Sequence, residues 1–215
     1  IFALLSHEYL LNILIRLGEI LNADPGDTVI AIDGKKLRNS ADASAGRSAL
    51  HTLNVFVTDN HTVLRQHFGE SKDAELTMLN EIIPLLNIKG ATITVDALGC
   101  HKEVTEKIIA QKAHYLIGLK KNQPTAYADV DALFKNAIQS DSPELNSYQT
   151  VDKGHGRIEE RSCLCLDIRD LGLASLEKFA GIRSVVRINS VTERKGKQSH
   201  EYRYYISSHE SDAKK

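Results

Sequence analysis

Apolar residues recur along the start of the chain at helical spacing. Leucine and isoleucine positions between residues 10 and 21 repeat every three or four residues, which predicts an amphipathic helix over residues 1–21. Charged side chains interrupt this stretch, so it lacks the uncharged run that a bilayer-spanning helix needs. The segment at residues 24–27 has the composition of a turn and should end the helix.

Two short apolar runs are each followed directly by an aspartate. Residues 28–32 are rich in β-branched side chains and predict a buried strand that ends at Asp33. Residues 91–95 repeat this pattern and predict a second buried strand that ends at Asp96. Both aspartates are therefore expected at the tips of strands.

Between these runs the pattern predicts a hairpin and a helix. Residues 51–58 and 61–68 predict two strands around the turn Asp59-Asn60. Ser71 or Asp73 can cap the helix that follows, and Pro84 should kink it.

After Asp96 the helical and strand patterns alternate, and the last third of the chain is rich in strands. A helix over 102–112, a strand over 114–119 and a helix that begins at Pro124 come first. Further strands are predicted over 148–151, 158–168, 182–191 and 202–207, with a short helix near 173–179.

This order predicts the fold class α/β, with an RNase H-like mixed sheet of three antiparallel strands followed by a parallel βαβ unit, and a β-rich insertion. The expected domains are an N-terminal helix over 1–24, a catalytic core over 25–140 and the insertion over 141–215. Because the first residue is Ile and not Met, we expect residues 1–24 to be the end of an upstream region.

Composition fits a folded protein of a reducing compartment. The 215 residues are 42% apolar and 26% charged, which argues against wholesale disorder. The three cysteines leave an odd thiol under any pairing, so we expect the cytoplasm. The formal net charge of −1 does not favour DNA binding as a whole, but the basic residues are clustered, and local patches can steer DNA.

The two aspartates indicate metal chemistry when they are taken together. In an RNase H-like sheet the first and fourth strands are neighbours, so Asp33 and Asp96 should meet. With a third carboxylate, such a pair can hold two Mg²⁺ ions, which prefer hard oxygen ligands. A single aspartate at a strand end is more often a turn or cap residue, and only the paired placement favours a metal site.

Five segments, taken in order, carry a resemblance to a known family. Residues 31–40, 93–102, 115–123, 154–161 and 204–208 resemble successive signatures of ISAs1 family transposases, which include the H-repeat-associated proteins. The resemblance implies that Asp33 and Asp96 are the first two members of a DDE triad. It places the third member, a glutamate, on a helix after the insertion, beyond Lys215. We therefore expect a piece lacking both ends that cleaves DNA poorly or not at all alone.

Basic and amide residues near these motifs are the candidates for DNA contacts. They are Lys35, Arg38, Lys120, Lys121, Asn122, Gln123, His155, Arg157 and Arg161. Surface charge is an alternative role for the basic residues, and turn or helix capping is an alternative for the two amides. The chain departs from the family at His101, at Lys120–Gln123 and at Ser71–Glu75, which concerns substrate contacts and not the fold.

The leading hypothesis is a transposase that cleaves and joins DNA strands with Mg²⁺ or Mn²⁺ as the cofactor. Its expected partners are the double-stranded DNA of the element ends and target and further copies of itself, in the cytoplasm with the nucleoid. One alternative is an inactive remnant that only binds DNA or protein. Another is a metal phosphohydrolase of small substrates, whose binding would not depend on salt as DNA binding does.

Overall fold

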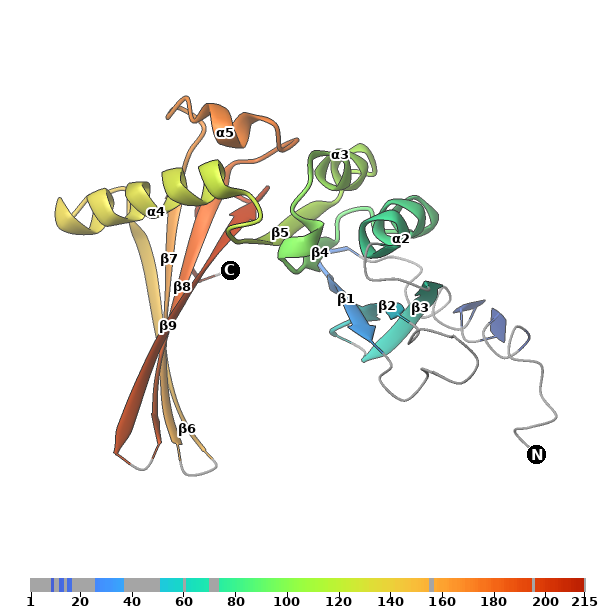
Figure 1. Cartoon of the computed structure of the whole chain (residues 1–215), viewed down its shortest axis with the longest axis horizontal. Coiled ribbons are helices and arrows are strands. Elements are labelled where there is room, and N and C mark those ends of the chain that lie inside the picture. Colours follow the sequence, from blue (N-terminus) through green and yellow to red (C-terminus); the bar gives the residue numbers. More distant parts are fainter. Residues whose placement is uncertain are drawn as a thin grey trace, which may run out of the picture. The chain divides into compact units, whose positions relative to one another are not determined.

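The chain divides into two compact units in a computed structural model, residues 1–114 and 115–215 (Figure 1). The structure describes residues 9, 12–13, 15–16, 26–36, 51–59, 61–69, 74–154, 157–194 and 196–214. Most of the helix predicted over 1–21 lies outside this range. The domain limits predicted after residues 24 and 140 remain predictions.

The first unit contains a mixed sheet in the strand order β3-β2-β1-β4. Its strands are β1 (Val29–Lys36), β2 (His51–Val57), β3 (Thr62–Gly69) and β4 (Thr92–Val95). β1 pairs antiparallel with β2 and parallel with β4, and β2 pairs antiparallel with β3. This is the predicted RNase H-like order, with the first and fourth strands side by side.

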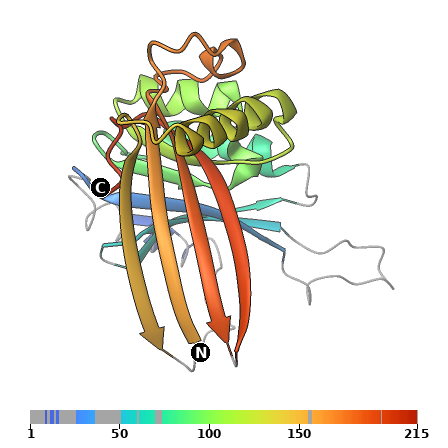
Figure 2. The same ribbon diagram turned by 90° about the vertical axis from the view of Figure 1, so that its left-hand side faces the viewer.

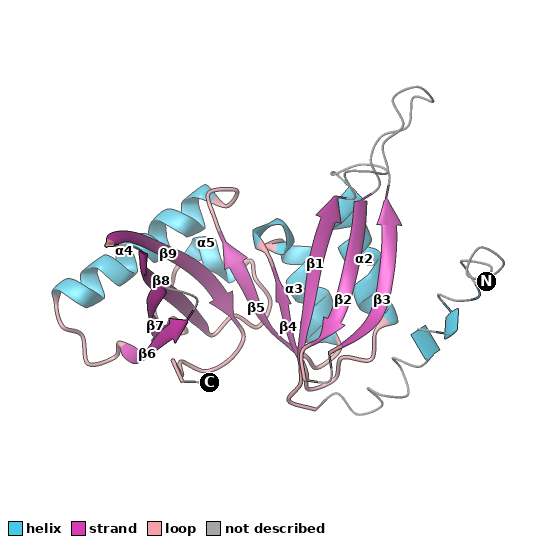
Figure 3. Ribbon diagram, turned by 90° about the horizontal axis from the view of Figure 1, so that it is seen from below, coloured by secondary structure: helices cyan, strands magenta, loops and turns pink. Residues whose placement is uncertain are grey.

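Helices cover one face of this sheet (Figure 3). They are α2 (Ala74–Ile82) with the short 3-10 helix η3 (Ile83–Leu85), and, after β4, η4 (Ala97–Gly99) and α3 (Lys102–Ala110). Pro84 was expected to kink this helix; instead the α-helix ends at Ile82, and Pro84 lies in the first turn of η3. Alternate strand residues such as Ile30, Ile32 and Val55 are buried, as one helix-covered face requires.

The second unit contains a sheet in the order β5-β9-β8-β7-β6, with each neighbouring pair antiparallel. Its strands are β5 (His114–Leu119), β6 (Asn146–Gly154), β7 (Arg157–Asp167), β8 (Ser184–Arg194) and β9 (Lys197–Ser207). The helices are α4 (Pro124–Gln139) and α5 (Ala174–Glu177). The long strands extend well beyond α4 (Figure 2), and all nine residues of β6 are exposed.

Tyr204 of β9 anchors α4 on this sheet. The ring is 2% exposed, stacks on Phe134 at a centroid distance of 5.8 Å, and meets Tyr127 edge-on at 5.3 Å. Its hydroxyl donates to Oδ1 of Asp131 at 2.7 Å. The helix is therefore held by an aromatic cluster with a satisfied polar group at its centre.

The two cysteines of β7 are packing residues. Cys165 is buried with Val186 and Ala213, and Cys163 packs against this cluster. Burial raises the pKa of Cys163 to about 11, so the thiolate is scarce at neutral pH.

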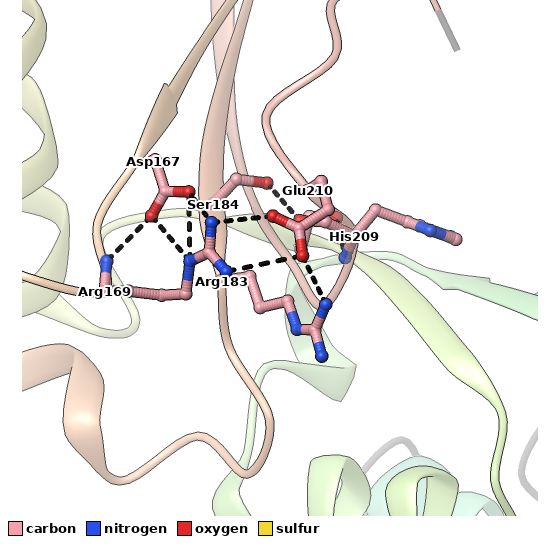
Figure 4. A network of polar contacts seen from close by, with 7 residues as sticks. Asp167, Arg169, Arg183, Ser184, His209 and Glu210 are labelled. Atoms are coloured by element: carbon pink, nitrogen blue, oxygen red, sulfur yellow. Dashed lines mark hydrogen bonds and ion pairs between the residues drawn. The ribbon is translucent and has the colours of Figure 1, made fainter. Parts of the chain in front are cut away.

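Charged side chains connect the segment after β9, which contains Glu210, to Arg169 and Arg183 (Figure 4). Glu210 forms ion pairs with Arg169 and Arg183, and Arg169 also pairs with Asp167. Buried Ser184 donates from Oγ to the His209 carbonyl at 2.9 Å. Half-exposed ion pairs contribute little stability, so the buried hydroxyl is the firmer attachment.

Candidate active site

Asp33 lies within β1 and not at its end, which corrects the predicted strand limit. β1 continues to Lys36 because β2 supplies partners for Gly34, Lys35 and Lys36. The pairing with β4, however, stops at Ile32. Asp33 is thus the first residue of β1 beyond the parallel pair, and its side chain is exposed.

Asp33 lies on the sheet face opposite to α2. Gly34, its neighbour, faces the helix, since a Cβ atom at Gly34 would lie 2.7 Å from Oε1 of Glu75 in α2. Side chains alternate along a strand, so Asp33 and Lys35 point to the other face.

Asp96 follows β4 directly and begins the 3-10 helix η4. Its backbone is extended, at φ −68° and ψ 178°, and its Oδ1 accepts a hydrogen bond from the Leu98 amide at 3.0 Å. One oxygen of the Asp96 carboxylate therefore caps η4, which is the role considered above for a single aspartate at a strand end.

The register brings the two aspartates to neighbouring positions. Ile32 pairs with Val95, and each aspartate is the next residue in its strand. Neighbouring strands lie about 4.8 Å apart. Residues that lie directly beside each other in parallel strands point to the same face of the sheet. Because the backbone stays extended at both Asp33 and Asp96, their carboxylates lie on the same face.

Carboxylate oxygens at neighbouring positions of β1 and β4 are of the type that binds divalent cations, but the described strands bring only two such side chains together. Within the residues that the structure describes, no group of three or more His, Cys, Asp or Glu side chains is placed to hold a metal ion. Glu159 and Glu160 lie in β7 of the other unit. The described residues therefore bring two carboxylates together and do not by themselves form a three-ligand metal site.

The predicted basic residues are exposed where the structure describes them. Lys35 lies two residues beyond Asp33 on the same face, and Lys120 and Lys121 follow β5. Arg38 and His155 lie outside the described residues, as does the side chain of Arg157.

Gln123 has a protein partner. Its Oε1 accepts from Nζ of Lys178 at 2.6 Å. Gln123 is the N-cap residue of α4, but its side chain makes no capping hydrogen bond. The helix-capping role considered as an alternative to DNA contact is therefore not seen for the Gln123 side chain. Asn122 lies in the same exposed turn before α4.

Arg161 lines a groove on one face of β7, β8 and β9. Arg161 donates to Oε1 of Glu159 from Nε at 3.0 Å, and Arg203 donates to Oε1 of Glu201 at 2.8 Å. Arg203 holds the pKa of Glu201 below its ordinary value. Each arginine in this groove therefore already has a carboxylate partner.

Two polar residues beside Asp33 were missed in the sequence. Asn54 of β2 lies directly opposite Asp33, and Gln66 of β3 lies directly opposite Asn54. Each places an amide side chain within a run of strand-forming residues, and this is the only feature of the sequence that could have pointed to them. Their proximity to Asp33 depends on register across three strands, which the pattern does not reveal.

Comparisons with known proteins identify the family of the chain. A family model described as "Transposase DDE domain" matches residues 24–215. The chain therefore belongs to the DDE transposase domain family. Membership in this family implies dependence on divalent metal ions.

Several curated relatives are named as putative transposases. The chain is 36% identical over 191 residues to "H repeat-associated putative transposase YhhI" of Escherichia coli strain K12, covering 87% of this chain and 50% of that protein. "Putative protein YbfL" of the same strain gives the same identity and coverage. The chain spans about half the length of these relatives.

A solved structure, "Cryo-EM structure of piggyBac transposase synaptic complex with hairpin DNA (SNHP)", superposes with a TM-score of 0.43 at 9% identity, over 87% of this chain and 34% of that one.

No helix in the part of the chain that the structure describes has the length and apolar character needed to cross a membrane.

Proposed function

We propose that this chain forms the catalytic core of a transposase in which Asp33 and Asp96 are two of three metal-binding carboxylates. The observation that carries the proposal is the parallel pairing of β1 with β4, which ends immediately before both aspartates. Two residues separated by much of the first unit thereby become neighbours at one edge of the paired region.

The two aspartates would hold Mg²⁺, or Mn²⁺ in its place, through carboxylate oxygens. Bound metal would supply activation of the attacking oxygen and stabilisation of the leaving oxygen in phosphodiester cleavage. Oδ2 of Asp96 is the oxygen that would ligate, because Oδ1 already accepts from the Leu98 amide. The third ligand would be the family glutamate, which the resemblance places after the insertion.

Double-stranded DNA at the ends of the element, and the target DNA, would be the substrates, and copies of the protein would associate during the reaction. Lys35 lies on the Asp33 face and would neutralise phosphate charge there. Lys120, Lys121, Asn122, Gln123 and the insertion residues Arg157 and Arg161 would contact the DNA backbone. Arg161 would have to exchange Glu159 for a phosphate.

The test uses the product of the whole reading frame that encodes this chain. Incubated with Mg²⁺ and DNA carrying the ends of its element, it should nick the DNA. Asp33→Asn and Asp96→Asn should each lower the cleavage rate by more than roughly 100-fold. Loss of a residue that only hydrogen-bonds to a metal ligand costs up to about that much, and loss of a ligand itself should cost more. Asp59→Asn, at the exposed turn between β2 and β3, is the matched control and should cleave normally.

Cleavage at the normal rate by either active-site variant, with circular dichroism showing both folded, would exclude the metal role. Absence of cleavage by the unaltered protein, together with intact DNA binding, would instead identify an inactive remnant.

A further inference from the structure

A chain of hydrogen bonds runs across the first sheet beside Asp33. Nε2 of Gln66 donates to Oδ1 of Asn54 at 2.7 Å, and Nδ2 of Asn54 donates to Oγ1 of Thr52 at 3.4 Å. Oγ1 of Thr52 donates in turn to the Lys35 carbonyl at 3.3 Å. The bonds connect β3 through β2 to β1.

The members of this chain share the face that carries Asp33. Asp33 pairs with Asn54, Lys35 pairs with Thr52, and Asn54 pairs with Gln66. Directly paired residues of antiparallel strands have Cβ atoms about 4.5–5.5 Å apart. The Asn54 amide is therefore within reach of the Asp33 carboxylate.

Gln66 decides which end of the Asn54 amide is available to Asp33. Because Gln66 donates to Oδ1, the carbonyl end of Asn54 is engaged on the β3 side. The amino group donates to Thr52, two residues earlier in β2, over a long bond of 3.4 Å. An amino group has two hydrogens, so it can serve Thr52 and a carboxylate together.

We infer that Asn54 is a positioning residue for the active site: its Nδ2, which bonds to Thr52 in this structure, has a second hydrogen that it donates to the Asp33 carboxylate when that carboxylate holds a ligand or turns toward β2, and Gln66 fixes the amide in the orientation that makes this possible. The inference rests on the proposed function for its consequence at the metal. A carboxylate held at one oxygen presents the other in a defined direction, and such outer partners orient metal ligands.

The contact itself is tested by NMR on the purified chain without metal. Asp33→Ala should shift the Asn54 side-chain amide signals and speed their exchange with solvent, because the acceptor is lost. Asp96→Ala, which removes a carboxylate from the next strand, should leave them unchanged. Unaltered Asn54 signals in Asp33→Ala would overturn the inference whether or not the chain binds metal.

The consequence is tested by Mn²⁺ titration of the same chain, followed by electron paramagnetic resonance. Asn54→Ala should weaken Mn²⁺ binding by about tenfold, and Gln66→Ala should weaken it less. The double variant should bind no more weakly than Asn54→Ala, because Gln66 acts through Asn54. His67→Ala, the neighbouring residue that binds Glu81 of α2, is the control and should bind normally.

The outcomes separate the two proposals. If Asp33→Asn leaves Mn²⁺ binding unchanged, the proposed metal role fails and the NMR result alone decides the Asn54–Asp33 contact. If Asp33→Asn abolishes Mn²⁺ binding and Asn54→Ala does not weaken it, the metal role stands and the positioning role is wrong. Additive losses in Asn54→Ala and Gln66→Ala would show that Gln66 does not act through Asn54.

Discussion

At the scale of single residues, Asp131 shows how one carboxylate can connect a helix to the sheet beneath it. It accepts from Nζ of Lys135 one turn away at 2.7 Å and from the buried Tyr204 hydroxyl at 2.7 Å. The bond from Lys135, followed by that from Tyr204, lowers the pKa of Asp131 below its ordinary value of 3.8. The ionised form is therefore the one that stabilises the fold.

Replacing Asp131 by Asn should reduce the free energy of unfolding by about 1–2 kcal/mol at pH 7. A lowered pKa in the folded state means that this stability is present above pH 3.8 and is lost as the pH falls through the folded value. The difference between the unaltered chain and Asp131→Asn should then shrink as the pH falls below 3.8, measured by urea unfolding. A difference that stays constant over this range would show that the ionised form carries no special stability.

Residue-level expectations succeeded where a local pattern was enough. Asp33 was correctly expected to leave the buried run after Ile32. The polar residues opposite Asp33 could not be identified in this way. Asn54 becomes relevant only through pairing of β2 with β1, and no local pattern reports that register.

At the scale of elements, the tight turn after β4 depends on a glycine. Gly99 is buried in η4, and a Cβ atom there would lie 3.0 Å from Cβ of Val95 and 3.4 Å from Cδ1 of Leu79. Val95 is the last residue of β4, directly before Asp96. A side chain at Gly99 would therefore strain the segment that positions the second aspartate.

Gly99→Ala should lower the free energy of unfolding by about 1–3 kcal/mol through overpacking. Gly154→Ala is the matched control, because a Cβ atom at Gly154 meets nothing within 4 Å, and this change should be close to neutral. Chemical denaturation of both variants measures the effect. Equal stabilities would mean that β4 and η4 adjust to the extra methyl group without cost.

Element limits were predictable where burial shapes the pattern. The strand at 114–119 and the start of the helix at Pro124 agree with β5 and α4, since β5 is an apolar run with four of its six residues buried and Pro124 lies in the first turn of α4. β6 was predicted too short because all of its residues are exposed, so no apolar alternation marks its ends. β1 was also predicted too short, because Gly34-Lys35-Lys36 is extended only through its pairing with β2.

At the scale of the whole molecule, the balance of charge bears on how DNA could be bound. The chain has 27 basic and 28 acidic residues, and the arginines of the strand groove are paired with carboxylates. Overall charge therefore gives no general attraction for phosphate. We therefore expect any DNA binding to depend on exposed basic residues such as Lys120 and Lys121, which lie together after β5.

Binding of the purified chain to duplex DNA should therefore depend on these two lysines and not on charge alone. Because each lost phosphate contact lowers the slope of log affinity against log salt by about 0.9, Lys120→Ala with Lys121→Ala should lower it by up to about 2. Lys89→Ala with Lys102→Ala removes the same formal charge from exposed positions of the first unit and should change the slope little. Fluorescence anisotropy between 50 and 200 mM salt measures both. An equal fall in the two double variants would show that net charge, rather than a local contact, governs DNA binding.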